Sequence, residues 1–280
     1  MRNSCHKIED QKTYDIKRLH RHLLDILSDV IRVCAELEID YFIMGGTALG
    51  AVRHGGFIPW DDDLDIGMRR EDYEKFLAEA QKHLREDLFL QTYRTEPGSP
   101  FYFAKVRKDN TKFVEKYCRK LAIHSGIYID IFPYDALPDD EKERKNHYRR
   151  MKWMLNLYIA KCVTGTSVEY RGMKRLLYGC VRHTLHLLML PVSKRFLYRQ
   201  TDRMMRKYND HPSQYLGYGG LPKIQVPRAD VLEPAEIAFE NLTVKCPQRI
   251  ETYLSHNFGD YKKLPPEEQR GGHAPWLIEY

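Results

Sequence analysis

The sequence predicts an α+β fold, with a mixed sheet and flanking helices in residues 1–137 and a mainly helical region plus a C-terminal segment in residues 138–280. Short apolar runs in the first half are typical of strands, and they alternate with stretches whose apolar residues recur at helical spacing. After Pro138 the composition changes to charged and apolar segments with helical spacing. The 280 residues, 42% of them hydrophobic, suffice for a packed core.

The first elements should follow the order helix, strand, helix, strand. Residues 14–37 predict an amphipathic helix that packs on a sheet. The apolar run Tyr41–Met44 predicts a strand that stops at a glycine turn, Gly45–Gly46, and Thr47 is expected to cap the short helix that follows. A second strand is expected at Asp63–Met68.

The following segments should complete the sheet. Residues 69–93 predict a helix followed by a strand, and residues 101–107 and 111–114 predict the two strands of a hairpin. In residues 127–132 the isoleucines share one strand face, and the opposite face carries a single acid, Asp130.

In the second half we expect helices up to about residue 208. The tail beyond them predicts a strand pair near residues 223–226 and 237–244 and a helix at 247–258.

Charge and cysteine usage narrow the class of protein. The net charge of +6 is spread along the chain, so it favours anionic partners, and we expect no nucleic acid among them. The six cysteines show no zinc-binding spacing, which favours a reduced compartment.

No apolar run in the sequence approaches the roughly 20 residues that cross a bilayer. We expect a cytoplasmic protein, with peripheral contact at the inner face of the cytoplasmic membrane as a further expectation.

The acidic run Asp61-Asp62-Asp63-Leu64-Asp65 is flanked by apolar residues, which is unusual for a solvated surface. In an extended strand Asp61, Asp63 and Asp65 share one face, where like charges repel. Clustered carboxylates need a cation or a proton, and oxygen ligands suit Mg²⁺, with Mn²⁺ as the alternative. The run therefore predicts a metal site.

A phosphate-transfer site follows from the combination of these features. A glycine turn before a helix suits phosphate binding, although diglycine turns are also common for conformational reasons alone. Together with Asp63, Asp65 and Asp130 it supplies a phosphate cradle and three carboxylates for metal, which is the set that phosphoryl transfer requires. The competing interpretation is a solvated acidic loop.

The run from Met44 to Ile66 closely resembles the signature of LicD-type phosphotransferases, which belong to the nucleotidyltransferase-fold superfamily and include the fukutin-related proteins. A looser resemblance continues through Ile127–Pro133 and Phe258–Pro266. It implies a nucleotidyltransferase-like sheet and transfer of phosphocholine, or a similar phospho-alcohol, from CDP-choline or a related CDP-alcohol. The implied acceptor is a hydroxyl of a cell-surface glycan (lipopolysaccharide, teichoic acid or a capsule precursor), lipid-linked during assembly, with Mg²⁺ and release of CMP.

The resemblance also implies roles for individual aspartates. Asp63 and Asp65 match the paired metal ligands of the superfamily, and Asp130 matches its third carboxylate, which we expect to bind metal and to act as the base. Asp61 and Asp62 belong to the signature with supporting roles.

Donor-binding residues follow from the same match. The glycines Gly45 and Gly46 and the hydroxyl residue Thr47 match the turn that faces the donor phosphates. Arg53 and His54 belong to the signature too; Arg53 can pair with phosphate, or it can serve as a helix C-terminal charge.

Lys105 and Arg107 share one strand face and are further candidates for phosphate contacts. A solvated strand face is the alternative for this pair.

Other functions remain open at this level. A nucleotidylyltransferase of the same fold would move an NMP group to a small hydroxylated acceptor, and a catalytically silent glycan- or membrane-binding protein could use the same scaffold. Residues 171–199 mix apolar and basic residues, which suits either core packing or a helix on anionic lipid.

Overall fold

A computed structural model describes residues 14–163, 172–222 and 224–280. Its helices are α1 Ile16–Glu36, α2 Gly45–His54, α3 Arg70–Glu79, α4 Glu141–Cys162, α5 Gly172–Met189, α6 Lys194–Met205, α7 Ala229–Leu232 and α8 Ile250–Phe258, with short 3₁₀ turns η1 Ala80–Lys82, η2 Arg206–Tyr208 and η3 Glu267–Gln269. Its strands are β1 Phe42–Ile43, β2 Asp65–Arg69, β3 Leu88–Gln91, β4 Ala104–Lys108, β5 Lys112–Val114, β6 Tyr128–Leu137, β7 Tyr215–Gly217, β8 Gln225–Pro227, β9 Ala235–Phe239, β10 Leu242–Cys246 and β11 Leu277–Glu279.

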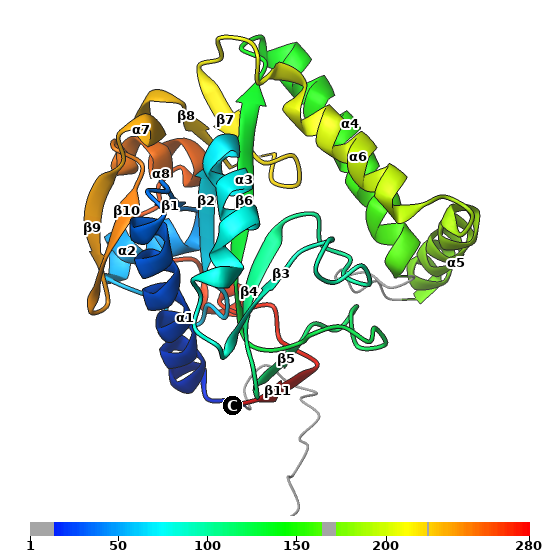
Figure 1. The fold of residues 1–280 in the computed structure, drawn as a ribbon, viewed down its shortest axis with the longest axis horizontal. Helices are drawn as coiled ribbons and strands as arrows, with labels where there is room; N and C mark the ends of the chain where they lie inside the picture. The colour runs from blue at the N-terminus through cyan, green and yellow to red at the C-terminus, as the bar shows by residue number, and fades with distance from the viewer. Residues whose placement is uncertain (1–13, 164–171, 223) are drawn as a thin grey trace, which may run out of the picture.

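A mixed sheet forms the centre of the molecule, as the sequence predicts (Figure 1). Within the described ranges it has seven strands, five of them in the order β1-β2-β6-β4-β3, with β7 and β8 continuing from the far end of β6. Only the β2–β6 pair is parallel among these pairings. Every residue of β6 is buried, so this strand is the core of the sheet.

Helices α1 and α3 pack against this sheet. The predicted amphipathic pattern of α1 is confirmed, since its buried residues include Leu19, Leu23, Ile26 and Val30 at three- and four-residue spacing. Asp15 caps the helix by accepting a hydrogen bond from the N–H of Arg18. The α+β class is therefore confirmed.

Two local predictions are wrong. Strand β5 does not form a hairpin with β4; it pairs with β11 near the C-terminus, and β4 pairs with β3 and β6. The tail hairpin joins β9 and β10, whereas β8 pairs with β7. For β5 a distant strand is the partner in place of the neighbour in sequence, whereas in the tail β8 and β9 each pair with a nearer strand than the one predicted.

Helices α4 and α6 lie side by side, and α5 lies at the end of this pair away from the sheet (Figure 1). None of the helices in the described ranges combines the length and the apolar character that a bilayer-crossing segment requires. The cysteines at 34, 118, 162, 180 and 246 are all free thiols.

The packing of α4 predicts acid-sensitive stability through His147. This side chain is 3% exposed, its Nε2 atom has no hydrogen-bond partner, and burial lowers the pKa of His147 to about 4. Between pH 6.5 and 4 the unfolded chain therefore binds a proton that the folded chain does not, so the free energy of unfolding decreases as the pH falls, by up to about 3 kcal/mol. Urea unfolding of the wild type and of His147→Leu across this range measures the effect. The variant should lose this part of the slope, whereas the exposed His211→Leu control should keep it.

Candidate active site

The carboxylates of the site come together through strand register. In the parallel β2–β6 pair, Asp65 is directly opposite Asp130, although 65 positions separate them in the sequence. In the antiparallel β6–β4 pair, Asp130 is directly opposite Lys105. Directly opposed residues point to the same face of a sheet, so Asp65, Asp130 and Lys105 form a row across three adjacent strands. Asp63 precedes β2 by two residues.

Helix α2 begins at Gly45, which corrects the predicted glycine turn. Its N-cap residue is Met44, and no side chain caps the helix. Thr47 instead lies within the first turn, where its hydroxyl accepts a hydrogen bond from the N–H of Asp65 at 2.9 Å. Gly45 adopts a φ of +55°, a conformation that favours glycine, so the helix can start one turn earlier than the threonine pattern predicts.

The glycines bring the start of α2 against two of the aspartates. A Cβ atom on Gly46 would lie 2.8 Å from Oδ2 of Asp61, and one on Gly45 would lie 3.6 Å from Oδ2 of Asp65. The first N–H groups of a helix favour negative charge nearby. The glycine pair therefore allows two partly buried carboxylates to approach a helix N-terminus.

Burial and mutual repulsion raise the pKa values of these acids. Burial, together with Asp63 and Asp130, raises the pKa of Asp65 well above its usual range. Burial and the neighbouring Asp63 raise the pKa of Asp61 to about 8, and these two side chains share a hydrogen bond. The cluster thus favours bound protons or a nearby cation at neutral pH.

Lys105 supplies one positive charge to the cluster. Its ammonium group donates to Oδ1 of Asp130 at 2.7 Å, lies 3.8 Å from Glu115, and is 3.5 Å from the ring centre of Tyr128. Burial raises the pKa of Asp130 to about 6, and the Lys105 charge limits that rise. Since Lys105 is 1% exposed, the alternative of a solvated strand face is wrong.

Arg107 is equally buried but its guanidinium is engaged by the protein. It donates to Oε1 of Gln91 at 2.7 Å and to the carbonyl of Gly126 at 2.9 Å. The structure therefore brings Lys105, and not Arg107, to the aspartates.

The C-terminal segment closes onto Asp62, a contact that sequence reasoning missed. The buried Asp62 carboxylate accepts hydrogen bonds from the Tyr14 hydroxyl at 3.0 Å and from the N–H groups of His273 and Ala274 at 2.8 and 3.1 Å. Gly272 passes so close that a Cβ there would lie 2.3 Å from Cγ of Asp62. Asp62 therefore anchors both ends of the described chain beside the site.

His273 supplies a second positive charge. Its Nδ1 atom lies 3.2 Å from both Asp62 and Asp63, and the hydrogen bond with Asp62 raises the pKa of His273 to about 10. Tyr253 on α8 is a further missed residue, because its hydroxyl accepts the N–H of Gly45 at 3.0 Å. Both lie over 200 positions from their partners, so no local motif could identify them.

Arg53 and His54 lie at the opposite end of α2, roughly 12 Å along the helix axis from Gly45. The Arg53 guanidinium donates to the carbonyl of Tyr261 at 3.2 Å and to the His54 ring at 3.0 Å. The structure thus joins this pair to the C-terminal segment and does not gather it with the aspartates.

The donor chemistry of the aspartates fits a hard divalent cation, since all of their ligand atoms are oxygens, and burial together with neighbouring carboxylates raises the pKa values of Asp63 and Asp65. Among the described residues, however, no three His, Cys, Asp or Glu side chains are already gathered as a metal site. Lys105 and His273 are instead the cations in contact with Asp130 and Asp63.

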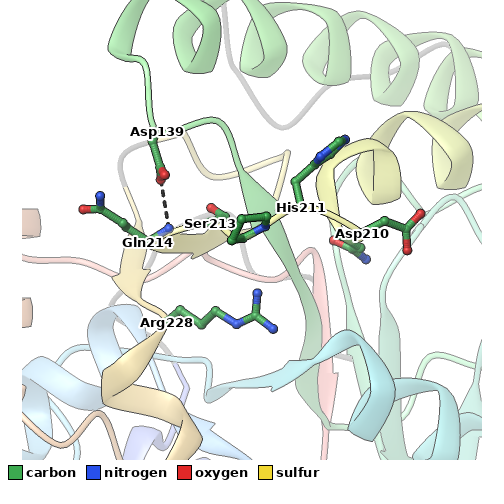
Figure 2. A pocket seen from close by; sticks show the side chains of 8 residues that line it. Asp139, Asp210, His211, Ser213, Gln214 and Arg228 are labelled. Carbon is green, nitrogen blue, oxygen red and sulfur yellow. Dashed lines mark hydrogen bonds between the residues drawn. The ribbon is translucent and has the colours of Figure 1, made fainter.

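The structure also contains a surface pocket (Figure 2). It is lined by residues including Asp139, Asp210, His211, Ser213 and Arg228, and Asp139 accepts the N–H of Gln214 at 2.8 Å. None of the candidate site residues lines this pocket.

The anchoring role of Asp62 is open to measurement. Asp62→Ala leaves buried N–H and hydroxyl donors without an acceptor, so the free energy of unfolding should fall by about 2–4 kcal/mol. Chemical denaturation compares it with the exposed control Asp260→Ala, which should lie within about 0.5 kcal/mol of the wild type. Equal stability of the two variants would contradict the anchor.

Comparison with known proteins relates this chain to one family. Residues 38–161 match the model of the LicD/FKTN/FKRP nucleotidyltransferase domain. Over 270 residues the chain is 28% identical to lipopolysaccharide cholinephosphotransferase LicD of Haemophilus influenzae, an alignment that covers 89% of this chain and 92% of that protein. It is also 42% identical over 52 residues to human ribitol 5-phosphate transferase FKRP, which is 19% of this chain and 10% of that protein.

The matched range contains the acidic run, Lys105 and Asp130, and the long alignment with the Haemophilus protein extends the similarity to most of the chain. These matches, and the aspartate geometry that they enclose, support a relationship of this chain to the LicD phosphotransferases.

Proposed function

We propose that this protein is a Mg²⁺-dependent phosphotransferase that moves phosphocholine, or a similar phospho-alcohol, from a CDP-linked donor to a hydroxyl of a cell-surface glycan and releases CMP. The observation that carries the proposal is the row formed by Asp65, Asp130 and Lys105 beside the start of α2. The similarity to the Haemophilus lipopolysaccharide cholinephosphotransferase supports the choice of donor and acceptor class.

Asp63, Asp65 and Asp130 are the residues that would hold Mg²⁺, and the ion would supply positive charge against the donor phosphates. The N-terminus of α2 serves the same end through backbone dipoles. Its N–H groups at Gly46 and Thr47 occupy the helix-terminal positions that suit phosphate oxygens, while that of Gly45 is bound to Tyr253.

Asp130 is the proposed base. Its raised pKa of about 6 is below neutral pH, so the carboxylate is ionised and yet basic enough to accept a proton from the acceptor hydroxyl. The hydroxyl oxygen bonds to the phosphorus that carries the alcohol, and the bond from that phosphorus to the CMP oxygen breaks. The proton remains on Asp130 and CMP departs with the electron pair.

Loss of the carboxylate of Asp65 or of Asp130 should abolish phosphocholine transfer. Asp65→Asn and Asp130→Asn should each lower kcat/KM for labelled CDP-choline by about a thousandfold or more, because a neutral amide neither neutralises a cation nor accepts the proton. The matched control Asp210→Asn, at an exposed position outside the segments that resemble the family, should retain wild-type activity. Unchanged turnover in both site variants would remove the site assignment.

The released product distinguishes this proposal from nucleotidyl transfer within the same experiment. CMP release with the labelled alcohol on the glycan is expected. Release of phosphocholine with the CMP group on the acceptor would overturn the phosphotransferase proposal while leaving the aspartate site in place.

Lys105 should control the pH at which Asp130 acts. Its charge holds the Asp130 pKa down, so Lys105→Met should raise that pKa and move the acidic limb of the kcat–pH profile upward by about one pH unit or more. Activity lost near neutral pH should return at higher pH, where Asp130 ionises again. The exposed Lys82→Met serves as the control. A uniform loss of activity with an unmoved limb would mean that Lys105 does not act through Asp130.

A further inference from the structure

Helix α5 has one face that packs against the protein. The guanidinium of Arg182 donates to the carbonyl of Val163 at 3.1 Å, and the His186 ring hydrogen-bonds the carbonyl of Ala160 at 2.7 Å. Ala160 lies in the last turn of α4, and Val163 is the residue that follows this helix. This face therefore fixes the helix to the end of α4, far from the sheet (Figure 1).

The opposite face of α5 is apolar and exposed. Six large apolar side chains of α5 are between 50% and 72% exposed: Met173, Leu176, Leu177, Val181, Leu187 and Leu188. At 100° per residue, these positions fall within one arc of about 140°. Leu190 and Phe196, which are 51% and 54% exposed, follow in the connection to α6 and in its first turn. Core packing therefore does not account for this side of the segment.

The surroundings of this face carry positive charge. Between Arg144 and Thr201 the sequence contains 13 Lys and Arg residues and a single acidic residue, Glu169. Lys152 on α4 and Arg195 and Arg199 on α6 have exposed side chains. Arg171, the first residue of the segment 171–199 that the sequence analysis singled out, lies outside the described residues. A broad apolar face within a strongly basic region is complementary to a surface that is apolar inside and anionic at its edge.

We propose that α5 docks this protein on an anionic phospholipid bilayer, with the apolar face at the level of the acyl chains and the basic residues of α4 and α6 at the headgroups. An acidic protein partner would match the charge but would leave six large apolar side chains in water, and a second copy of this chain would bring like charges together. A lipid surface satisfies both features. The proposal goes beyond the proposed function, because lipid binding requires neither donor nor acceptor.

The test is co-sedimentation of the full chain with vesicles, in the absence of any substrate. We expect binding to vesicles of equal parts phosphatidylcholine and phosphatidylglycerol, weaker binding to phosphatidylcholine alone, and loss of binding as salt is raised. The fourfold variant Leu176→Ser, Leu177→Ser, Leu187→Ser, Leu188→Ser should reduce the partition coefficient by more than about tenfold.

Matched controls separate docking from folding. Leu232→Ser with Leu264→Ser replaces exposed leucines elsewhere, so this double variant should bind vesicles as the wild type does. If the fourfold variant does not fold, the charge variant Lys152→Glu, Arg195→Glu, Arg199→Glu replaces exposed side chains only and should lose binding to anionic vesicles. Wild-type binding by a folded fourfold or charge variant overturns the proposal. Absence of vesicle binding by the wild type also overturns it. If the wild type does not bind vesicles but sediments as a dimer, and the fourfold variant sediments as a monomer, the apolar face of α5 joins two copies of the chain instead.

Discussion

The parallel pairing of β2 with β6 is the constraint on which the site depends. It places Asp65 opposite Asp130, and the antiparallel pairing of β6 with β4 then places Lys105 on the other side of Asp130. Because side chains alternate along a strand, a slip of one residue would turn Asp130 to the other face. Strands on both sides of β6 hold its register, so the central acid of the row is positioned by the best-packed element of the fold.

This arrangement has an electrostatic cost that the rest of the structure offsets. Several partly or fully buried carboxylates lie together, and burial with mutual repulsion raises the pKa values of Asp61, Asp63, Asp65 and Asp130. Lys105 from the sheet and His273 from the C-terminal segment place positive charge against the cluster. The carboxylates outnumber these two positive charges, so the site is suited to a divalent cation and to substrates that bind together with a divalent cation.

Local sequence predicted the elements well where one segment determines its own structure. The amphipathic pattern of α1 depends on burial of one face, and the strand around Asp130 is an apolar run that is buried on both faces; the residues themselves encode both. Prediction was wrong for the glycine turn, where the positive φ of Gly45 starts α2 before Thr47, and for the β4–β5 hairpin, where β11 is the partner of β5. The first outcome depends on the conformation of Gly45 itself, and the second depends on a segment that lies far away in the sequence.

The sequence by itself predicted the class of fold, the resemblance to a family and the acids of the candidate site, because strand and helix periodicity and the acidic signature are properties of short contiguous runs. Only the tertiary structure decided that Lys105 is buried against Asp130, that His273 and Tyr253 reach the site, and that Arg53 does not. It also decided that one face of α5 is exposed while the other packs on α4. The physical reason is that burial and charge pairing are set by which distant segments meet, and chain contacts across 25 to more than 200 positions leave no local pattern in the sequence.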